Sequence, residues 1–170
     1  ARNDIEGKIA RYAWGKDYHK VLEKKLKALK AQIIALTGPA AELKDYSDTG
    51  PILERQAAAR AGLGFIGKNT LLLNAKNGSY FFLAEILTNL HLDYSNPITT
   101  SCGSCRACLD ACPTQAFPEP YQLDATRCIS YLTIEHRTSI APELRKLMGE
   151  LVYGCDICQD VCPWNRRAGV

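Results

Sequence analysis

The sequence CGSCRACLDACP at residues 102–113 has a shorter counterpart, CDICQDVCP, at residues 155–163. With Cys128 between them, the two runs hold all eight cysteines of this 170-residue chain. A four-iron cluster needs four thiolates around a compact cube, and one loop with two-residue spacings can supply three of them. In proteins with two such clusters, the cysteine before the proline of each run binds the other cluster. The spacing therefore predicts two [4Fe-4S] clusters.

This rule divides the eight cysteines into two complete sets. The predicted ligands of one cluster are Cys102, Cys105, Cys108 and Cys162, and those of the other are Cys112, Cys128, Cys155 and Cys158. Disulfides explain the pattern less well, because four bridges within such short spacings would be strained. Structural zinc also uses Cys-x2-Cys pairs, but zinc knuckles rarely contain the longer run at residues 102–113. Inert buried thiols would not cluster in this way.

The composition is that of a soluble globular protein, with 46% hydrophobic and 23% charged residues. No apolar run approaches the ~20 residues of a membrane span, so no membrane partner is expected. Thiolate ligands indicate a reducing compartment, the cytoplasm. The formal charge of +3 counts the cysteines as neutral, and two clusters of about −2 each would bring the chain close to neutrality. Because the chain ends at Val170, directly after the second run, we expect a piece of a longer protein.

The first half of the chain has the pattern of an α/β protein. Between Tyr18 and Leu36, apolar residues recur at alternating steps of four and three, which places them on one face of a helix. Gly38-Pro39 ends this predicted helix. His19 lies at its start, where a histidine is more often solvated than a ligand.

Asp48 precedes a second predicted helix, over Pro51–Ala61. Pro51 suits the first turn of a helix, and Asp48 could cap the free amides of that turn. A carboxylate at the end of a tight loop is also a natural position for a proton donor. The spacing alone favours the helix cap, and both interpretations stay open.

A glycine-rich stretch and two apolar runs come next. Gly62–Asn69 lacks the spacing of a P-loop, so it is either a connecting loop or a place where the backbone approaches a large ligand. Thr70–Leu73 and Tyr80–Leu87, joined by a turn with Asn77-Gly78, predict a β-hairpin. Both strands are almost continuously apolar, which favours a sheet covered on both faces. We therefore expect an α/β layer domain over residues 1–95.

Residues 96–170 are expected to form a ferredoxin-like α+β domain around the two clusters. Short helices at Cys105–Cys112 and Cys155–Cys162 would present thiolates on one side. Two more are predicted between the runs: Pro142–Met148, and a segment that starts at Asp124 and carries Cys128, Tyr131, Leu132 and His136.

Four stretches together resemble the epoxyqueuosine reductase family, which acts on queuosine-modified tRNA. They are ARYAWGKDYH at residues 10–19, DTGPILER at residues 48–55, GLGFIGKN at residues 62–69, and the full cysteine pattern that ends in VCPWN at residues 161–165. They span nearly the whole chain. The cysteine runs are shared with many ferredoxins, whereas the stretches at 48–55 and 62–69 are far more particular.

The resemblance implies a fold and a chemistry. It implies a nitroreductase-like α/β layer domain that binds cobalamin, as in some reductive dehalogenases, followed by the two-cluster domain. Electrons would pass through the clusters to the cobalt of the corrin ring, and Asp48 would protonate the departing epoxide oxygen. The role of proton donor reverses the earlier preference for Asp48 as a helix cap. The residues expected near the corrin are Arg11, Asp48, Leu72, Leu83, Ile129, His136, Cys155 and Asp156.

The resemblance also implies partners. The substrate would be a modified base in the anticodon loop of tRNA, where single-stranded bases can be splayed out. Family members usually carry a further C-terminal region associated with tRNA, so tRNA binding is expected of the full-length protein. We further expect an external one-electron donor such as flavodoxin or ferredoxin, and a monomer.

Two other functions stay open. A two-cluster ferredoxin that only carries electrons would explain the cysteines but not the stretches at 48–55 and 62–69. A corrinoid dehalogenase relative would act on a small halogenated molecule, and it predicts an export signal and a small closed pocket. Cobalt near one per chain would exclude the pure electron carrier.

Overall fold

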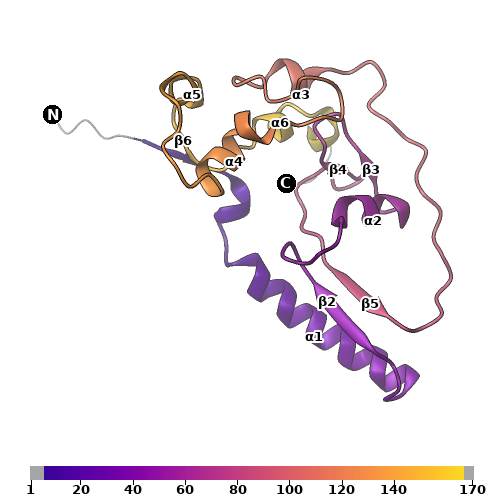
Figure 1. Ribbon diagram of the computed structural model, residues 1–170. Helices are drawn as coiled ribbons and strands as arrows, with labels where there is room; N and C mark the ends of the chain where they lie inside the picture. Colours follow the sequence, from indigo (N-terminus) through magenta and orange to yellow (C-terminus); the bar gives the residue numbers. More distant parts are fainter. Residues whose placement is uncertain (1–5, 167–170) are drawn as a thin grey trace.

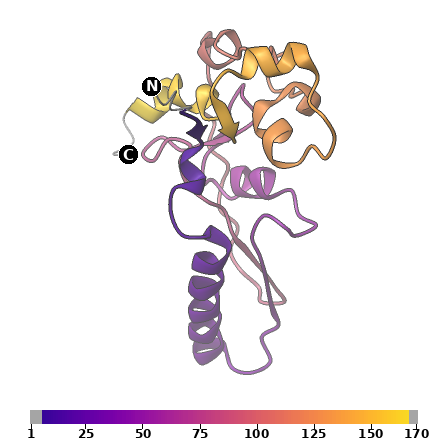
Figure 2. The ribbon, with the colours of Figure 1, turned by 90° about the vertical axis from the view of Figure 1, so that its left-hand side faces the viewer.

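The computed structural model describes residues 6–166, so the predicted domain limits at residues 1 and 170 lie outside the described residues. The longest helix and one sheet extend away from a part that contains both cysteine runs (Figures 1 and 2). Within residues 6–166, no helix combines the length and apolar character that crossing a membrane requires.

The elements follow in the order β1 (Lys8–Ile9), η1 (Arg11–Ala13), α1 (Tyr18–Thr37), β2 (Leu43–Tyr46), α2 (Glu54–Arg60), β3 (Phe65–Ile66), β4 (Leu72–Leu73), β5 (Glu85–Thr88), α3 (Ala107–Asp110), η2 (Ala125–Arg127), α4 (Ile129–Ile134), α5 (Pro142–Met148), β6 (Leu151–Tyr153), α6 (Ile157–Asp160) and η3 (Pro163–Arg166).

Helix α1 confirms the helix predicted from the apolar spacing. It begins after Asp17, whose carboxylate accepts a hydrogen bond from the backbone N–H of His19 at 3.0 Å. This is the usual way to satisfy a free amide at a helix start. The helix ends at Gly38, as predicted.

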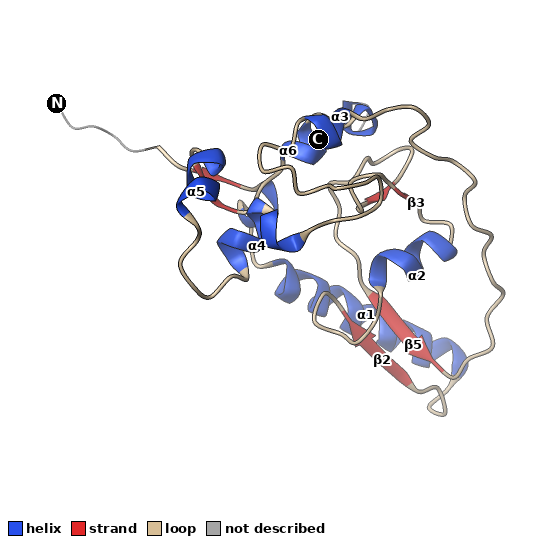
Figure 3. Ribbon diagram, turned by 45° about the horizontal axis from the view of Figure 1, so that its top comes forward, coloured by secondary structure: helices blue, strands red, loops and turns tan. Residues whose placement is uncertain are grey.

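The apolar face of α1 is only partly covered by the described residues. Leu26 is buried, whereas Leu36 is 87% exposed. The Lys30–Asp45 ion pair connects α1 to β2, and the helix lies alongside the β2–β5 sheet (Figure 3).

The strands of residues 6–166 form three separate two-stranded sheets. β2 pairs antiparallel with β5, β3 pairs antiparallel with β4, and β1 pairs parallel with β6. The predicted hairpin between Thr70–Leu73 and Tyr80–Leu87 is therefore wrong. Its turn does form, closed by a bridge between Asn74 and Gly78. The expected cover on both faces is also wrong for the described residues, because Leu87 of β5 is 50% exposed.

Long-range hydrogen bonds draw the chain away from a hairpin directly after this turn. The backbone N–H of Ser79 donates to Asn165 Oδ1 at 2.7 Å, and the Tyr80 hydroxyl donates to Asp160 Oδ1 at 2.6 Å. Both partners lie in or after the second cysteine run. The first bond satisfies a backbone N–H that a hairpin could have paired, and the second holds the Tyr80 side chain against the second cysteine run, so β5 is left to pair with β2.

Helix α2 begins later than predicted. It covers Glu54–Arg60 instead of Pro51–Ala61, and its N-cap position is Leu53, which makes no side-chain cap hydrogen bond. Asp48 therefore does not cap this helix, and that interpretation is wrong. The residues from Asp48 to Leu53 form a loop instead.

The pairing of β1 with β6 crosses the predicted boundary between residues 95 and 96. Lys8 lies opposite Leu151, and Ile9 lies opposite Tyr153. The first described strand thus packs within the cysteine-rich part (Figure 1). The division of the chain at that boundary stays a prediction.

Two small apolar clusters support the cysteine runs. One buries Ile129, Leu132 and Met148 beneath Cys155, and the other buries Phe65, Leu73 and Cys162 beside Cys102 and Trp164. Because each cluster includes or touches a cysteine, apolar packing fixes where that sulfur lies.

The helices of the cysteine-rich part are shorter than predicted. α3 and α6 occupy only the central four residues of their runs. The single helix predicted from Asp124 is replaced by η2 and α4, with Cys128 at the N-cap of α4. α4 ends at Ile134, so the prediction that His136 belongs to this helix is wrong.

An extended segment returns the chain from β5 to the first cysteine run along the outside of the molecule (Figure 1). Residues 91–100 have no regular structure and are exposed. Gly62 allows this segment to pass close to the end of α2. Its φ is +72°, and a Cβ atom there would lie 2.4 Å from the carbonyl oxygen of Asn96.

Candidate functional site

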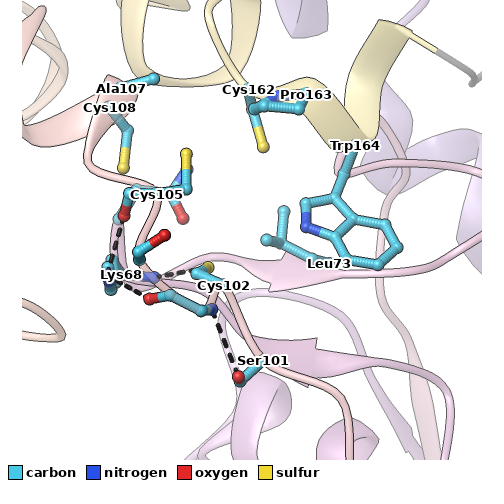
Figure 4. A pocket seen from close by; sticks show the side chains of 13 residues that line it. Lys68, Leu73, Ser101, Cys102, Cys105, Ala107, Cys108, Cys162, Pro163 and Trp164 are labelled. Atoms are coloured by element: carbon cyan, nitrogen blue, oxygen red, sulfur yellow. Dashed lines mark hydrogen bonds between the residues drawn. The ribbon is translucent and has the colours of Figure 1, made fainter.

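Four cysteine side chains surround one cavity of about 530 Å³ between the two runs (Figure 4). They are Cys102, Cys105, Cys108 and Cys162, the set that the spacing predicts for one cluster. In residues 6–166, no three His, Cys, Asp or Glu side chains converge closely enough to hold a single metal ion. The sulfur atoms face a common space instead (Figure 4). Four thiols around a cavity are a donor set that fits a four-iron cube.

The remaining four cysteines form a second group of electrostatic neighbours. Burial raises the pKa of Cys155 to about 11, and the further contributions that raise it include Cys128 and Cys112. Burial also raises the pKa of Cys158, and the further contributions that raise it come from Cys155, Cys128 and Cys112 and from Cys108 of the first set. The cysteines of the other predicted ligand set thus influence one another's pKa, and Cys108 of the first set contributes as well.

These buried thiols need positive charge to become thiolates. Burial raises the pKa of Cys108 and of Cys162 as well, with the cysteines of their own set as further contributors. Free thiols in such surroundings stay protonated near neutral pH. Iron binding must therefore release protons.

Lys68 connects the glycine-rich stretch to the first cysteine loop. Its ammonium group donates to the carbonyl oxygens of Gly103 and Cys105 at 2.7 and 2.8 Å, and its backbone N–H lies 3.5 Å from the sulfur of Cys102 (Figure 4). Gly62–Asn69 thus contributes Lys68 and Asn69 to the wall of the cysteine cavity.

Lys68→Met is expected to lower the reduction potential of the cluster at Cys102, Cys105, Cys108 and Cys162. The substitution removes a positive charge that favours the more negative, reduced cluster. A redox titration followed by electron paramagnetic resonance measures the two clusters separately. One control is the reduction potential of the second cluster, and the other is Lys76→Met, a substitution at an exposed lysine. Neither potential is expected to change as much as that of the first cluster in Lys68→Met. Equal potentials in Lys68→Met and the parent would contradict this role.

Asp48 lies at a separate cavity of about 270 Å³ near the start of α1. The Tyr18 hydroxyl donates to Asp48 Oδ2 at 2.8 Å, and His19 Nε2 lies 3.5 Å from the same oxygen. Burial, followed by the hydrogen bond to Asp48, raises the pKa of Tyr18. The phenol therefore stays protonated and acts as a donor. Its ring stacks on His19 and on Phe82, with centroid distances of 4.0 and 4.4 Å.

The backbone of Asp48 has an uncommon conformation. Its φ is +65°, in the left-handed region that non-glycine residues seldom adopt. The Glu54 carboxylate accepts a hydrogen bond from the Asp48 N–H, and the Ser47 hydroxyl donates to the carbonyl oxygen of Leu83 at 3.0 Å. Such a conformation persists only where its surroundings hold it, and it is typical of functional loops.

Six of the eight residues expected near a corrin line two adjoining cavities. Asp48, Leu72 and Leu83 line the first, and Arg11, Cys155 and Asp156 line its neighbour of about 390 Å³. The shared lining residues are Tyr12, Leu71, Ser79, Phe81 and Phe82. The other two expected contacts lie elsewhere: Ile129 is buried in the apolar cluster beneath Cys155, and His136 lies 2.9 Å from the Thr138 hydroxyl. The adjoining cavities extend from Asp48 to Cys155.

Sequence reasoning missed Tyr18, Glu54 and Lys68 as residues of these sites. None of them departs from its local pattern, because Tyr18 and Glu54 begin helices and Lys68 lies in a loop. All three lie within the stretches at 10–19, 48–55 and 62–69. Their position within these three stretches is the sequence signal by which the three residues could have been identified.

The matches to known proteins indicate first the class of protein and then its family. Residues 101–165 match the family model described as "4Fe-4S double cluster binding domain", so this part of the chain is an iron–sulfur domain. Residues 1–49 match the model described as "Epoxyqueuosine reductase QueG, DUF1730". The chain is also 53% identical to an epoxyqueuosine reductase of Pseudomonas aeruginosa and 52% identical to one of Synechocystis sp.. The chain belongs to the epoxyqueuosine reductase family, as the resemblance predicted.

The alignments cover this chain almost completely and its relatives only in part. The two matches span 94% and 95% of this chain, but 44% and 56% of the relatives. The chain thus spans about half the length of the curated relatives it matches.

Solved structures show the same likeness. An epoxyqueuosine reductase in complex with an epoxyqueuosine-modified tRNA stem loop matches with a TM-score of 0.90 and 44% identity, over 95% of this chain and 42% of that one. The Bacillus subtilis enzyme matches with a TM-score of 0.88 and 42% identity over the same shares, and its structure has the catalytic aspartate loop swung out of the active site. A catabolic reductive dehalogenase shares the fold alone, with a TM-score of 0.56 and 23% identity, over 76% of this chain and 19% of that one.

Proposed function

We propose that this chain carries the redox core of an enzyme that reduces epoxyqueuosine to queuosine in tRNA. The observation that supports this most is the pair of adjoining cavities, with the Asp48 carboxyl group at one end and Cys155 at the other. The proposed proton donor and a proposed cluster ligand thus line one space. The family relative crystallised with a tRNA stem loop supports the choice of substrate.

The reaction converts the epoxide into an alkene. It consumes two electrons and two protons, and the oxygen leaves as water. When bound, the two clusters supply electrons one at a time and cobalamin supplies the reductant for the carbon–oxygen bonds. The side chains of this protein bind the substrate and the cofactors and deliver the proton.

Asp48 is the proposed proton donor. The hydrogen bond from Tyr18 to its Oδ2 atom holds the carboxyl group in one orientation at the cavity. His19 lies 3.5 Å from the same oxygen and is 45% exposed, so it offers a route by which a proton from solvent restores the acid.

Cobalamin is proposed to lie over the two adjoining cavities. Tyr12, Phe81 and Phe82 offer aromatic surface for a large ring, and Arg11 offers a cation for its polar side groups. The first part of the chain, residues 1–95, would then be a nitroreductase-like layer domain. Residues 96–170 would form the ferredoxin-like domain that holds the clusters through the two cysteine sets.

The proposed partners derive from the reaction. tRNA would bind to the full-length protein through its anticodon loop, and an external one-electron donor such as flavodoxin or ferredoxin would reduce the clusters. We propose a monomer that works in the cytoplasm, where its tRNA substrate is found.

The full-length protein, purified anaerobically and supplied with cobalamin, is expected to bind about one cobalt and about eight iron atoms. It should convert epoxyqueuosine in an anticodon stem loop to queuosine, as measured by mass spectrometry of the nucleosides. The same preparation without cobalamin serves as the control. If the protein binds iron but no cobalt, only the function of an electron carrier remains. If it binds cobalt but does not convert epoxyqueuosine to queuosine, the proposed substrate is wrong.

A further inference from the structure

Two carboxyl groups from different elements meet behind the Asp48 loop. Glu54 is the first residue of α2, and Glu85 is the first residue of β5, where it lies opposite Tyr46 of β2. We propose that Glu54 and Glu85 share one proton and that this pair holds Asp48 in its place at the cavity. Glu54 is then a positioning residue for the proton donor. Only the link to catalysis rests on the function proposed above.

Glu85 has a buried carboxyl oxygen that needs a proton. Within residues 6–166, its Oε1 atom is buried without a hydrogen-bond partner, although its side chain lies within hydrogen-bonding reach of Glu54. Two ionised carboxylates are both acceptors and cannot bond to each other. One shared proton satisfies both groups and removes the repulsion between them.

The surroundings of Glu85 favour its protonated form at weakly acidic pH. Burial, followed by the charge of Glu54, raises the pKa of Glu85 from 4.5 to about 7. The guanidinium of Arg55, the residue after Glu54, donates instead to the carbonyl oxygen and the hydroxyl of Thr70. Tyr46 is the titratable cross-strand neighbour of Glu85 on β2.

Glu54 transmits this arrangement to the loop. The carboxyl group that faces Glu85 also accepts the backbone N–H of Asp48. Asp48 sits at a φ of +65°, so an external hydrogen bond is needed to hold its peptide group in that conformation. On the α1 side, Tyr18 and His19 contact the side chain of Asp48, not its backbone.

The pair makes the loop sensitive to pH. Because the pKa of Glu85 is raised in the folded protein, the stability that the shared proton contributes is fully present below 4.5. It is lost as the pH rises through about 7. Above that pH two negative charges face each other, and Glu54 turns toward solvent and releases the Asp48 amide.

Hydrogen–deuterium exchange of the Asp48 amide in the full-length protein, corrected for the intrinsic pH dependence of exchange, tests this inference. In the parent protein, exchange is expected to accelerate by roughly tenfold from one pH unit below to one unit above the pKa of Glu85. Glu85→Gln donates to Glu54 at every pH, so exchange should stay slow and pH-independent. Glu54→Ala removes the acceptor and should give fast exchange throughout. Glu23→Gln, on the exposed face of α1, is the matched control and should behave like the parent.

Two results would overturn the inference. One is an acceleration in Glu85→Gln equal to that of the parent, and the other is slow Asp48 exchange in Glu54→Ala. Circular dichroism and iron content show whether each variant is folded. The exchange measurement reports the loop and not turnover. If Asp48 proves dispensable for catalysis while its amide responds as expected, the proposed function fails and the carboxyl pair stands.

Discussion

Asp48→Asn is expected to lower turnover by about 10²–10⁴-fold, the usual contribution of general acid catalysis. Asparagine keeps the shape of the side chain and can accept the Tyr18 hydrogen bond, but it has no acidic proton to give. It also tolerates the positive φ of this position better than most residues. Because Leu53 and not Asp48 occupies the N-cap of α2, the substitution should leave the helix intact.

The measurement is the rate of queuosine formation by the full-length protein, alongside its iron and cobalt content and its thermal unfolding. Asp93→Asn, in the exposed segment after β5, is the matched control and should retain the parent rate. Metal content and folding should be unchanged in both variants. An Asp48→Asn enzyme that forms queuosine at close to the parent rate would refute the assignment of Asp48 as the proton donor.

Cys162→Ala is expected to abolish one cluster and spare the other. Cys162 lies across the cavity from Cys102, Cys105 and Cys108, although it belongs to the second run. Its loss leaves three thiolates for that cluster, so the iron content should fall from about eight to about four atoms per chain. The cluster at Cys112, Cys128, Cys155 and Cys158 should keep its spectrum.

Electron paramagnetic resonance of the reduced protein distinguishes the two clusters. Cys108→Ala should remove the same signal as Cys162→Ala, because the two side chains line one cavity. Cys158→Ala is the complementary control and should remove the other signal. Loss of the Cys155–Cys158 signal in Cys162→Ala would show that each run builds its own cluster.

The position of Cys162 beside the first cysteine run could be predicted from the sequence because cluster geometry constrains spacing directly. Two-residue gaps within a loop and a proline after the crossing cysteine are local features, and the structure gathers Cys162 with the first run as this rule requires. Helix α1 could be predicted equally well, because its apolar residues follow the helical period and Gly38 is its C-cap residue.

Longer-range features could not be predicted in this way. The turn at Asn77-Gly78 forms, but the bonds of Ser79 and Tyr80 to Asn165 and Asp160 decide the path of the chain after the turn. Pro51 was predicted to lie in the first turn of a helix, but the helix begins only at Glu54, whose carboxylate accepts a hydrogen bond from the backbone N–H of Asp48 across the loop. Glu54 influences the pKa of Glu85, although the two residues are 31 positions apart in the sequence and Glu85 belongs to a strand that pairs with β2. No periodicity of either segment contains this information.

The parallel pairing of β1 with β6 has a consequence for biosynthesis. Lys8 leaves the ribosome early, but its partner Leu151 is made only shortly before the second cysteine run is complete. Strand β1 therefore stays without its partner strand while the residues between the two strands are translated. Likewise, Cys102 is synthesised long before Cys162, which lines the same cavity. Completion of the clusters must therefore come after synthesis of the second run, and nascent chains stalled before residue 150 are expected to carry no complete cluster.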